Sequence, residues 1–281
     1  MDFSKFNLSI VGLGLIGGSF AKALRKCGFK NIWALDVNEN SLKKAEKLGI
    51  IDKGFMDSKI PLSKSDIVIM CLYPELEVKF LKDNVKYLKK GCIVTDVTGV
   101  KESMISEIQR IMPKDLDFIP GHPMAGKESK GFDISSEKIF EGSDYILITA
   151  NNKLENIKIL KEILNKINIR KIVEMNSKEH DEMIAYVSQL PHVLAAAFIK
   201  NRRFFKDNLC FGGSFRDITR VSNINSRLWS ELLAENKENV VNEMNKLIDE
   251  LEIIKRFVQK GDVCNLNRIF DEVREIREDM I

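Results

Sequence analysis

The sequence predicts an α/β domain followed by an all-α domain. Thirteen of the sixteen glycines precede residue 145, and no proline follows Pro191. Because glycine and proline interrupt regular structure, we expect many short elements in the first part and long helices in the second. Short β-branched runs alternate with amphipathic segments in the first part, which is typical of a parallel, doubly wound sheet. We expect domains at residues 1–175 and 176–281, joined by a short hinge.

The expected elements follow from this alternation. Helices are predicted at Ser19–Cys27, Ser41–Leu48 and Leu154–Ile167, and a glycine follows each of the first two. Asn176 is a suitable helix cap, and apolar residues then recur at helical spacing from Arg227 to Val258. The expected strands are Leu8–Val11, Asn31–Asp36, Asp66–Leu72, Cys92–Asp96, Phe118–Pro120, Tyr145–Thr149 and Lys171–Glu174.

Composition excludes several classes of protein. Lys and Arg total 44 against 41 Asp and Glu, which argues against a nucleic-acid-binding protein. The five cysteines include no CxxC pair, so we expect reduced thiols in a cytoplasmic protein rather than disulfides or a metal site. We expect no export signal, and no apolar stretch long enough to span a membrane.

The segment Gly12-Leu13-Gly14-Leu15-Ile16-Gly17 lies between an expected strand and an expected helix. In a dinucleotide-binding (Rossmann) domain, glycines with this spacing allow a tight turn, close approach of a pyrophosphate, and close packing of the helix on the strand. Asp36 ends the next strand, where a carboxylate accepts ribose hydroxyls and repels a 2′-phosphate. NAD is therefore favoured over NADP; the alternative is a glycine-rich turn with a surface aspartate.

Other residues are expected at the same cofactor. Leu15 and Ile16 belong to the glycine-rich loop, whereas Leu72, Tyr73 and Asp96 lie at or just after the ends of two further expected strands. The carboxyl ends of parallel strands face the cofactor crevice.

The chain has three histidines. His122 follows an expected strand, where a neutral imidazole is placed to accept a hydroxyl proton while hydride leaves the same carbon. The alternative is a loop histidine bonded to a carbonyl. His192 follows Pro191 at an expected helix start, where it would meet an anion or merely cap or pack. His180 is interpreted as part of a solvated helix face, with no role in a site.

The segment Gly212–Arg220 interrupts the helical region with flexible backbone and two arginines. The guanidinium fork binds carboxylates bidentately, which suits an acidic substrate. We favour Arg220 for this role and interpret Arg216 as half of a surface ion pair. Trp229 is either part of the helical core or a wall of the substrate pocket.

Four separated segments resemble the prephenate dehydrogenase family: Gly12–Ser19, Asp96–Lys101, Gly121–Glu128, and Ser188–His192 with Gly213–Arg220. They span essentially the whole chain in the right order, and the His-Pro-Met-Ala-Gly and Asp-Ile-Thr-Arg segments are the most specific. The resemblance implies oxidative decarboxylation of prephenate by NAD⁺ to 4-hydroxyphenylpyruvate and CO₂, in tyrosine biosynthesis. It also implies a homodimer formed by the helical domain and, since Ile281 leaves no room for a regulatory domain, a single-function enzyme.

The resemblance also implies roles for individual residues. His122 would take the proton of the C4 hydroxyl, and Arg220 and His192 would hold the substrate carboxylates. The pocket would be framed by Ser188, Gly213, Asp217 and Trp229, with Glu128 as an acidic gate.

This chain departs from the family pattern at two positions. Gly99 stands where the family often has a serine that orients the catalytic histidine, so we expect Thr98 to take over that role. Gln189 stands where the family often has histidine.

Three alternatives remain open from the sequence. An arogenate dehydrogenase differs only in whether the substrate side chain carries an amino or a keto group. A β-hydroxyacid dehydrogenase would use a lysine base in the helical domain, such as Lys178 or Lys200. A nucleotide-sensing protein that has lost catalysis is the third, although retention of His122 and Arg220 argues against it.

Overall fold

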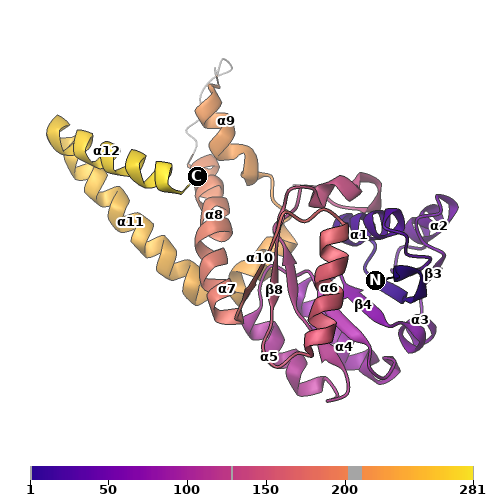
Figure 1. Ribbon diagram of the computed structural model, residues 1–281. Helices are drawn as coiled ribbons and strands as arrows, with labels where there is room; N and C mark the ends of the chain where they lie inside the picture. Colours follow the sequence, from indigo (N-terminus) through magenta and orange to yellow (C-terminus); the bar gives the residue numbers. More distant parts are fainter. Residues whose placement is uncertain (1, 128, 202–210, 281) are drawn as a thin grey trace.

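The computed structural model describes residues 2–127, 129–201 and 211–280 and shows two domains, the first built on a parallel sheet (Figure 1). The strands of that sheet are β1 (Asn7–Val11), β2 (Asn31–Leu35), β3 (Lys53–Phe55), β4 (Ile67–Met70), β5 (Ile93–Asp96) and β6 (Asp117–Phe118). Their order is β3-β2-β1-β4-β5-β6, which is the order of a dinucleotide-binding sheet. The register places Val11 opposite both Leu35 and Met70, so the carboxyl ends of these strands form one edge.

A second, three-stranded sheet contains β7 (Gly121–Pro123), β8 (Asp144–Ile148) and β9 (Lys171–Met175). β7 is antiparallel to β8, and β8 is parallel to β9. The sequence predicts one parallel sheet, and the difference arises because β6 is only two residues long and Pro120 lacks the N–H that a longer strand would donate. His122 therefore lies within a strand, opposite Ile146, and not in a loop after one.

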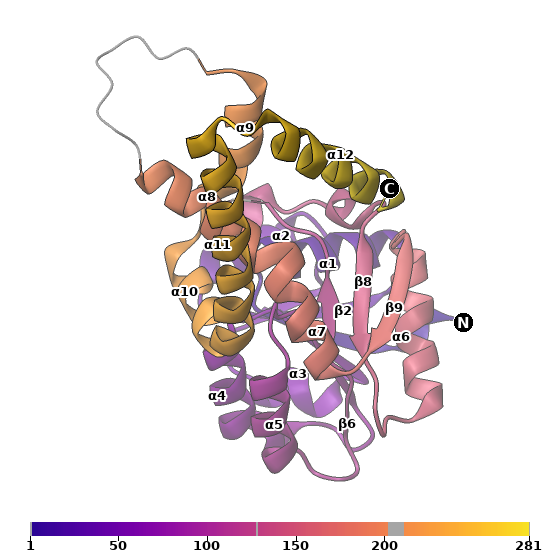
Figure 2. The ribbon, with the colours of Figure 1, turned by 90° about the vertical axis from the view of Figure 1, so that its left-hand side faces the viewer.

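Helices cover both faces of the parallel sheet (Figures 1 and 2). Their apolar faces pack on the strands in two buried clusters that include Leu24 and Ile69 on one side and Val68 and Ile108 on the other. The helices are α1 (Leu15–Lys26), α2 (Glu39–Lys47), α3 (Lys59–Lys64), α4 (Pro74–Asn84), α5 (Glu102–Ile111) and α6 (Leu154–Lys166), with 3₁₀ turns at Phe3–Lys5, Val85–Tyr87, Phe132–Ile134 and Glu137–Phe140.

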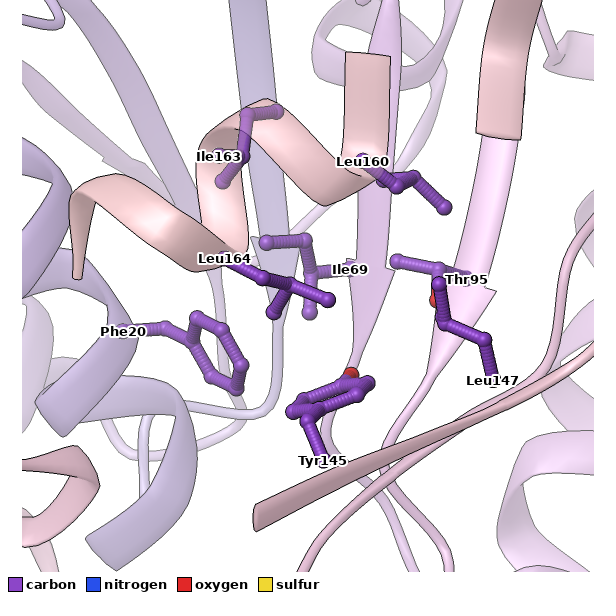
Figure 3. Close-up of a pocket in the computed structure, with 8 residues that line it drawn as sticks. All are labelled: Phe20, Ile69, Thr95, Tyr145, Leu147, Leu160, Ile163 and Leu164. Carbon is purple, nitrogen blue, oxygen red and sulfur yellow. The ribbon is translucent and has the colours of Figure 1, made fainter. Parts of the chain in front are cut away.

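An apolar cavity lies under α6, with Phe20, Tyr145 and Leu160 among its walls (Figure 3). Its volume of about 10 Å³ is room for a single water molecule at most. This cavity is therefore too small to hold a substrate.

The second domain is helical and begins at α7 (Ser177–Ile184), one residue after Asn176. Asn176 forms a reciprocal capping box with Glu179, which fixes where the helix begins. The remaining elements are a π-helical turn η5 (Ala185–Gln189), α8 (Leu190–Lys200), α9 (Gly213–Thr219), a 3₁₀ turn η6 (Arg220–Ser222), α10 (Ser226–Glu235), α11 (Lys237–Lys260) and α12 (Val263–Asp279). α11 and α12 project away from the sheets (Figures 1 and 2).

The continuous helical run Ser177–Lys200 is long and apolar enough to cross a membrane by length and composition, contrary to the sequence expectation. The same run carries the buried polar residues His180, Asp181 and Gln189. All three hydrogen-bond to other parts of the chain.

Candidate active site

The glycine-rich loop has the geometry that its sequence predicts. Gly12 has a φ of +92°, and a side chain there would meet the carbonyl oxygen of Cys71 at 2.5 Å. A Cβ at Gly17 would lie 1.9 Å from the carbonyl oxygen of Gly12, so α1 packs directly on the turn. Gly14 borders open space at the start of α1, and no side chain caps this helix. The free N–H groups there fit a pyrophosphate, next to the half-buried Leu15 and Ile16.

Asp36 lies just beyond β2, at the same edge. Its Oδ2 accepts the backbone N–H of Leu13 at 2.6 Å, and its Oδ1 accepts that of Asn38 at 2.7 Å. A carboxylate has lone pairs to spare after these two bonds, so Asp36 both stabilises the loop and fits the ribose hydroxyls of NAD.

Tyr73 connects the cofactor edge to the helical domain. Leu72 and Tyr73 follow β4 and are half-buried. The Tyr73 hydroxyl accepts a hydrogen bond from Asn225, the N-cap of α10, at 2.6 Å. The guanidinium of Arg227 also lies 5.7 Å from the centre of the Tyr73 ring. α10 is therefore fixed at its N-terminal end to the nucleotide-binding domain.

Asp96 lies at the end of β5 with its carboxylate fully buried. Its Oδ2 pairs with the buried Lys101 ammonium at 2.5 Å and accepts the Thr98 hydroxyl at 2.5 Å, while its Oδ1 accepts the N–H of Gly121 at 3.1 Å. The buried side chain thus holds the loop after β5 and the start of β7. Thr98 donates to Asp96 and not to His122, so the expectation that Thr98 orients the imidazole is wrong.

Glu77 of α4 is buried near the same ion pair. Among the described residues, neither of its carboxylate oxygens has a hydrogen-bond partner. Burial and the nearby Asp96 raise the pKa of Glu77 well above its usual value, with Lys101 opposing them. Burial therefore favours the protonated, uncharged form of Glu77.

The hydrogen-bond partner of His122 is His180. His122 Nδ1 lies 2.9 Å from His180 Nε2, and His180 Nδ1 lies 2.6 Å from Asp181 Oδ1. The expectation of a solvated His180 is wrong, since its side chain is 0% exposed. Because its neighbours Lys178, Glu179 and Glu182 are exposed and charged, nothing in the local pattern signalled this burial.

His122 is neutral at physiological pH. Burial lowers its pKa well below the usual value, and the nearby His180 and Lys101 lower it further. The side chain is only half-buried, so a ligand can still reach the ring. A neutral imidazole at the edge of the sheets is a competent acceptor for a hydroxyl proton.

The helical domain contributes a second cluster. His192 of α8 stacks on Trp229 of α10, with ring centres 3.7 Å apart, and Trp229 is only half-buried. His192 Nδ1 donates to the Ser188 carbonyl at 2.8 Å, which fixes the orientation of the ring. Ser188 itself lies in the π-helical turn, a feature common at functional sites.

α10 brings the two clusters together through Leu232, one turn after Trp229. A Cβ on Gly99 would lie 3.3 Å from Leu232 and 3.8 Å from Cε1 of His122. The buried Gln189 fixes α10 from the other side by donating to the Leu232 carbonyl at 3.1 Å. The Trp229 face of α10 is therefore held beside His122.

The remaining predicted residues lie differently. Arg220 begins η6, which packs on α8, and its side chain is exposed. Gly213 and Asp217 are exposed on α9, which meets the far part of α8 through a contact of Phe215 with Phe198. Within one chain, Gly213 and Asp217 are not brought beside His122. Glu128 lies outside the described residues.

Comparison with known proteins decides the family. The profile of the prephenate dehydrogenase nucleotide-binding domain matches residues 20–173, and that of the prephenate dehydrogenase dimerization domain matches residues 176–272. The chain belongs to the prephenate dehydrogenase family. Prephenate dehydrogenase of Bacillus subtilis is 30% identical over 99% of this chain and 77% of its own length.

Solved structures of this family have the same architecture. Prephenate dehydrogenase from Aquifex aeolicus, in complex with hydroxyphenyl propionate and NAD⁺, covers all of both chains with 30% identity and a TM-score of 0.90. Arogenate dehydrogenase from Synechocystis covers 98% of this chain and all of its own, with 25% identity and a TM-score of 0.83. As a member of the prephenate dehydrogenase family, this chain is an NAD-dependent oxidoreductase.

Neither lysine that could serve as the base of a β-hydroxyacid dehydrogenase lies in a buried site. Lys178 is exposed and pairs with Glu182 on the same helix, and Lys200 is exposed at the end of α8. A 3-hydroxyisobutyrate dehydrogenase from Mycobacterium tuberculosis resembles this chain with a TM-score of 0.54 at 13% identity, which shows a shared fold only.

Proposed function

We propose that this prephenate dehydrogenase family member oxidatively decarboxylates prephenate. The placement of His122 carries this proposal: a neutral, half-buried imidazole lies beside the cofactor edge, and α10 holds an aromatic wall opposite it. The established family, and its relatives named as prephenate dehydrogenases, support the choice of substrate.

His122 Nε2 would accept the proton of the C4 hydroxyl of prephenate as that carbon loses hydride. The glycine-rich loop would hold NAD⁺, which would supply the hydride acceptor. The C–C bond to the ring carboxylate then breaks, and its electron pair makes the ring aromatic as CO₂ leaves. The chain therefore needs no separate acid for decarboxylation. The phenolate oxygen takes the proton back from His122, so no proton has to leave the site.

The substrate carboxylates would be held by the helical domain. The Arg220 guanidinium would supply a bidentate fork, and the His192 imidazole, which stacks on Trp229, would supply a second contact. Ser188 would border this pocket from the π-helical turn. These assignments leave the keto side chain of the substrate facing the helical domain.

NADH formation by the purified chain tests the proposal, with prephenate and arogenate compared at equal concentrations. We expect turnover and a higher kcat/KM with prephenate. NADH with neither substrate would reject the function. Preference for arogenate would reject the choice of substrate but keep the chemistry, since the two differ only at the side chain.

We also propose that the enzyme is a cytoplasmic homodimer. The helical domain matches a dimerization domain, and α11 and α12 leave Ile248, Leu251, Phe270 and Val273 more than half exposed. An apolar surface of this kind is stabilised by a second copy. Gly213 and Asp217 would then reach the substrate only as part of the dimer. The described cysteines are free thiols, which fits a reducing compartment.

A further inference from the structure

A chain of three buried or half-buried side chains leads from the proposed base into the molecule. His122 contacts His180 at 2.9 Å, and His180 contacts Asp181 at 2.6 Å. Asp181 Oδ2 accepts the backbone N–H of Glu102 at 2.8 Å, and both carboxylate oxygens lie near that of Lys101, at 2.9 and 3.2 Å. The carboxylate is thus held at the start of α5 by backbone N–H donors.

These donors fix the direction of the two hydrogen bonds that join Asp181, His180 and His122. A carboxylate that already receives backbone N–H groups acts as an acceptor, so His180 Nδ1 must carry the hydrogen toward it. Burial lowers the pKa of His180, so the ring is neutral and its Nε2 holds a lone pair. His122 Nδ1 must then be the donor in the bond between the two rings, which leaves the lone pair of His122 on Nε2.

We infer that Asp181 and His180 are positioning residues that lock His122 in the tautomer with an unprotonated Nε2, the atom that takes the substrate hydroxyl proton. The inference rests on the proposed function for the role of Nε2, but the tautomer itself is a property of the resting protein. His180 and Asp181 are both buried, so they act on the reaction through His122.

The lock has a second consequence during the reaction. When Nε2 of His122 takes the proton, the ring becomes cationic while its Nδ1–H remains bonded to the lone pair of His180. The negative charge of Asp181 lies directly behind His180 and stabilises this cation. Because the proton returns to the phenolate oxygen, His180 and Asp181 do not need to conduct it to solvent. The full burial of His180 agrees with this.

The substitution Asp181→Asn tests the lock because its effect on hydrogen-bond direction follows from the structure. The Glu102 N–H contacts Oδ2 alone, at 2.8 Å, and therefore favours the amide oxygen at that position. The Lys101 N–H lies between the two oxygens, 2.9 Å from Oδ1 and 3.2 Å from Oδ2, so it can donate to the same amide oxygen. The amide NH₂ would then face His180 and donate to Nδ1, which reverses both hydrogen bonds and puts a hydrogen on His122 Nε2. The corresponding wrong-tautomer substitution in the serine protease triad lowers kcat about 10⁴-fold.

We expect Asp181→Asn to lower kcat by roughly 10²- to 10⁴-fold with little change in the KM for prephenate or NAD⁺. His180→Gln breaks the connection to Asp181 but leaves an amide oxygen that can accept the Nδ1–H of His122, so it should lower kcat by less than Asp181→Asn does. In the His180→Gln background, Asp181→Asn should have little further effect, since the reversal can no longer pass through the second ring. The matched control is Ile184→Val, a buried change on the same helix that leaves His122, His180 and Asp181 intact.

Nitrogen chemical shifts of isotope-labelled histidine give a readout that a packing role would not move. The chain has three histidines, so each signal is assigned by single substitution. In the resting enzyme with NAD⁺, His122 should be neutral with hydrogen on Nδ1, and Asp181→Asn should move that hydrogen to Nε2. The opposite tautomer in the parent overturns the inference, as does near-parent kcat in Asp181→Asn. A parent with the expected tautomer that oxidises neither prephenate nor arogenate would reject the proposed function alone.

Discussion

Replacing His122 by asparagine separates its chemistry from its packing. The introduced amide would lie where Nδ1 of the ring lies, and its NH₂ can still donate to Nε2 of His180, now at 2.9 Å from Nδ1. The variant therefore keeps the buried hydrogen bond and loses only the outer nitrogen of the ring. A net hydrogen bond is worth about 1 kcal/mol, so the free energy of unfolding should change by no more than about that amount.

The loss in rate should be much larger than the loss in stability. General bases contribute roughly 10²- to 10⁴-fold, so the barrier should rise by about 2.7 to 5.4 kcal/mol in His122→Asn. Steady-state NADH formation measures kcat, and NAD⁺ titration checks that cofactor binding is retained. A kcat within a few-fold of the parent would refute the assignment of His122 as the base, even though the family is established.

The pH profile of the same pair of proteins gives a second check. Only the neutral imidazole accepts a proton, so kcat/KM should fall as pH drops through the pKa of His122. Burial, His180 and Lys101 place that pKa well below its usual value, so the parent should keep its activity through pH values near 6.5 and lose it only in more acidic buffer. The acidic limb should be absent in His122→Asn, and a limb that persists unchanged would assign it to another group.

Substitutions at four further positions test the surrounding groups. Asp36→Ser should relax the preference for NAD⁺ over NADP⁺, measured as the ratio of kcat/KM values, and equal efficiencies in the parent would contradict the role of Asp36. Arg220→Lys should raise the KM for prephenate sharply because a point charge replaces a bidentate fork, whereas an unchanged KM would leave Arg220 a structural residue. Gly99→Ala adds a Cβ 3.3 Å from Leu232 and should lower Tm slightly; Gly99→Ser adds the same Cβ and a hydroxyl beside the imidazole, so any rate difference between these two variants measures the hydroxyl. Because its pKa is raised in the folded state, Glu77 contributes stability that is fully present below its unfolded pKa near 4.3 and is lost as pH rises through the folded pKa. The stability of Glu77→Gln relative to the parent should therefore increase with pH. A Tm difference that is independent of pH would contradict this.

The sequence alone determined the fold class, the cofactor loop and the family. Gly12, Gly14, Gly17 and Asp36 act within one strand-turn-helix unit and the strand beside it, so their spacing in the chain carries their spatial relation. Turn glycines and helical periodicity likewise report on local backbone geometry, which is why the strands and helices that were expected lie within a few residues of observed ones. The helices α3, α4 and α5 were not expected from these patterns.

Only the tertiary structure decided how the base is oriented. His180 lies in a short run of charged residues that is typical of a solvated surface, yet α7 docks against the loop after β5 and buries it against His122, 58 residues earlier in the chain. The same docking joins Asp181 to the start of α5 and leaves Thr98 bonded to Asp96. Local patterns encode whether a residue favours helix or strand, whereas burial and the direction of a hydrogen bond between two rings depend on which surfaces meet when the domains pack.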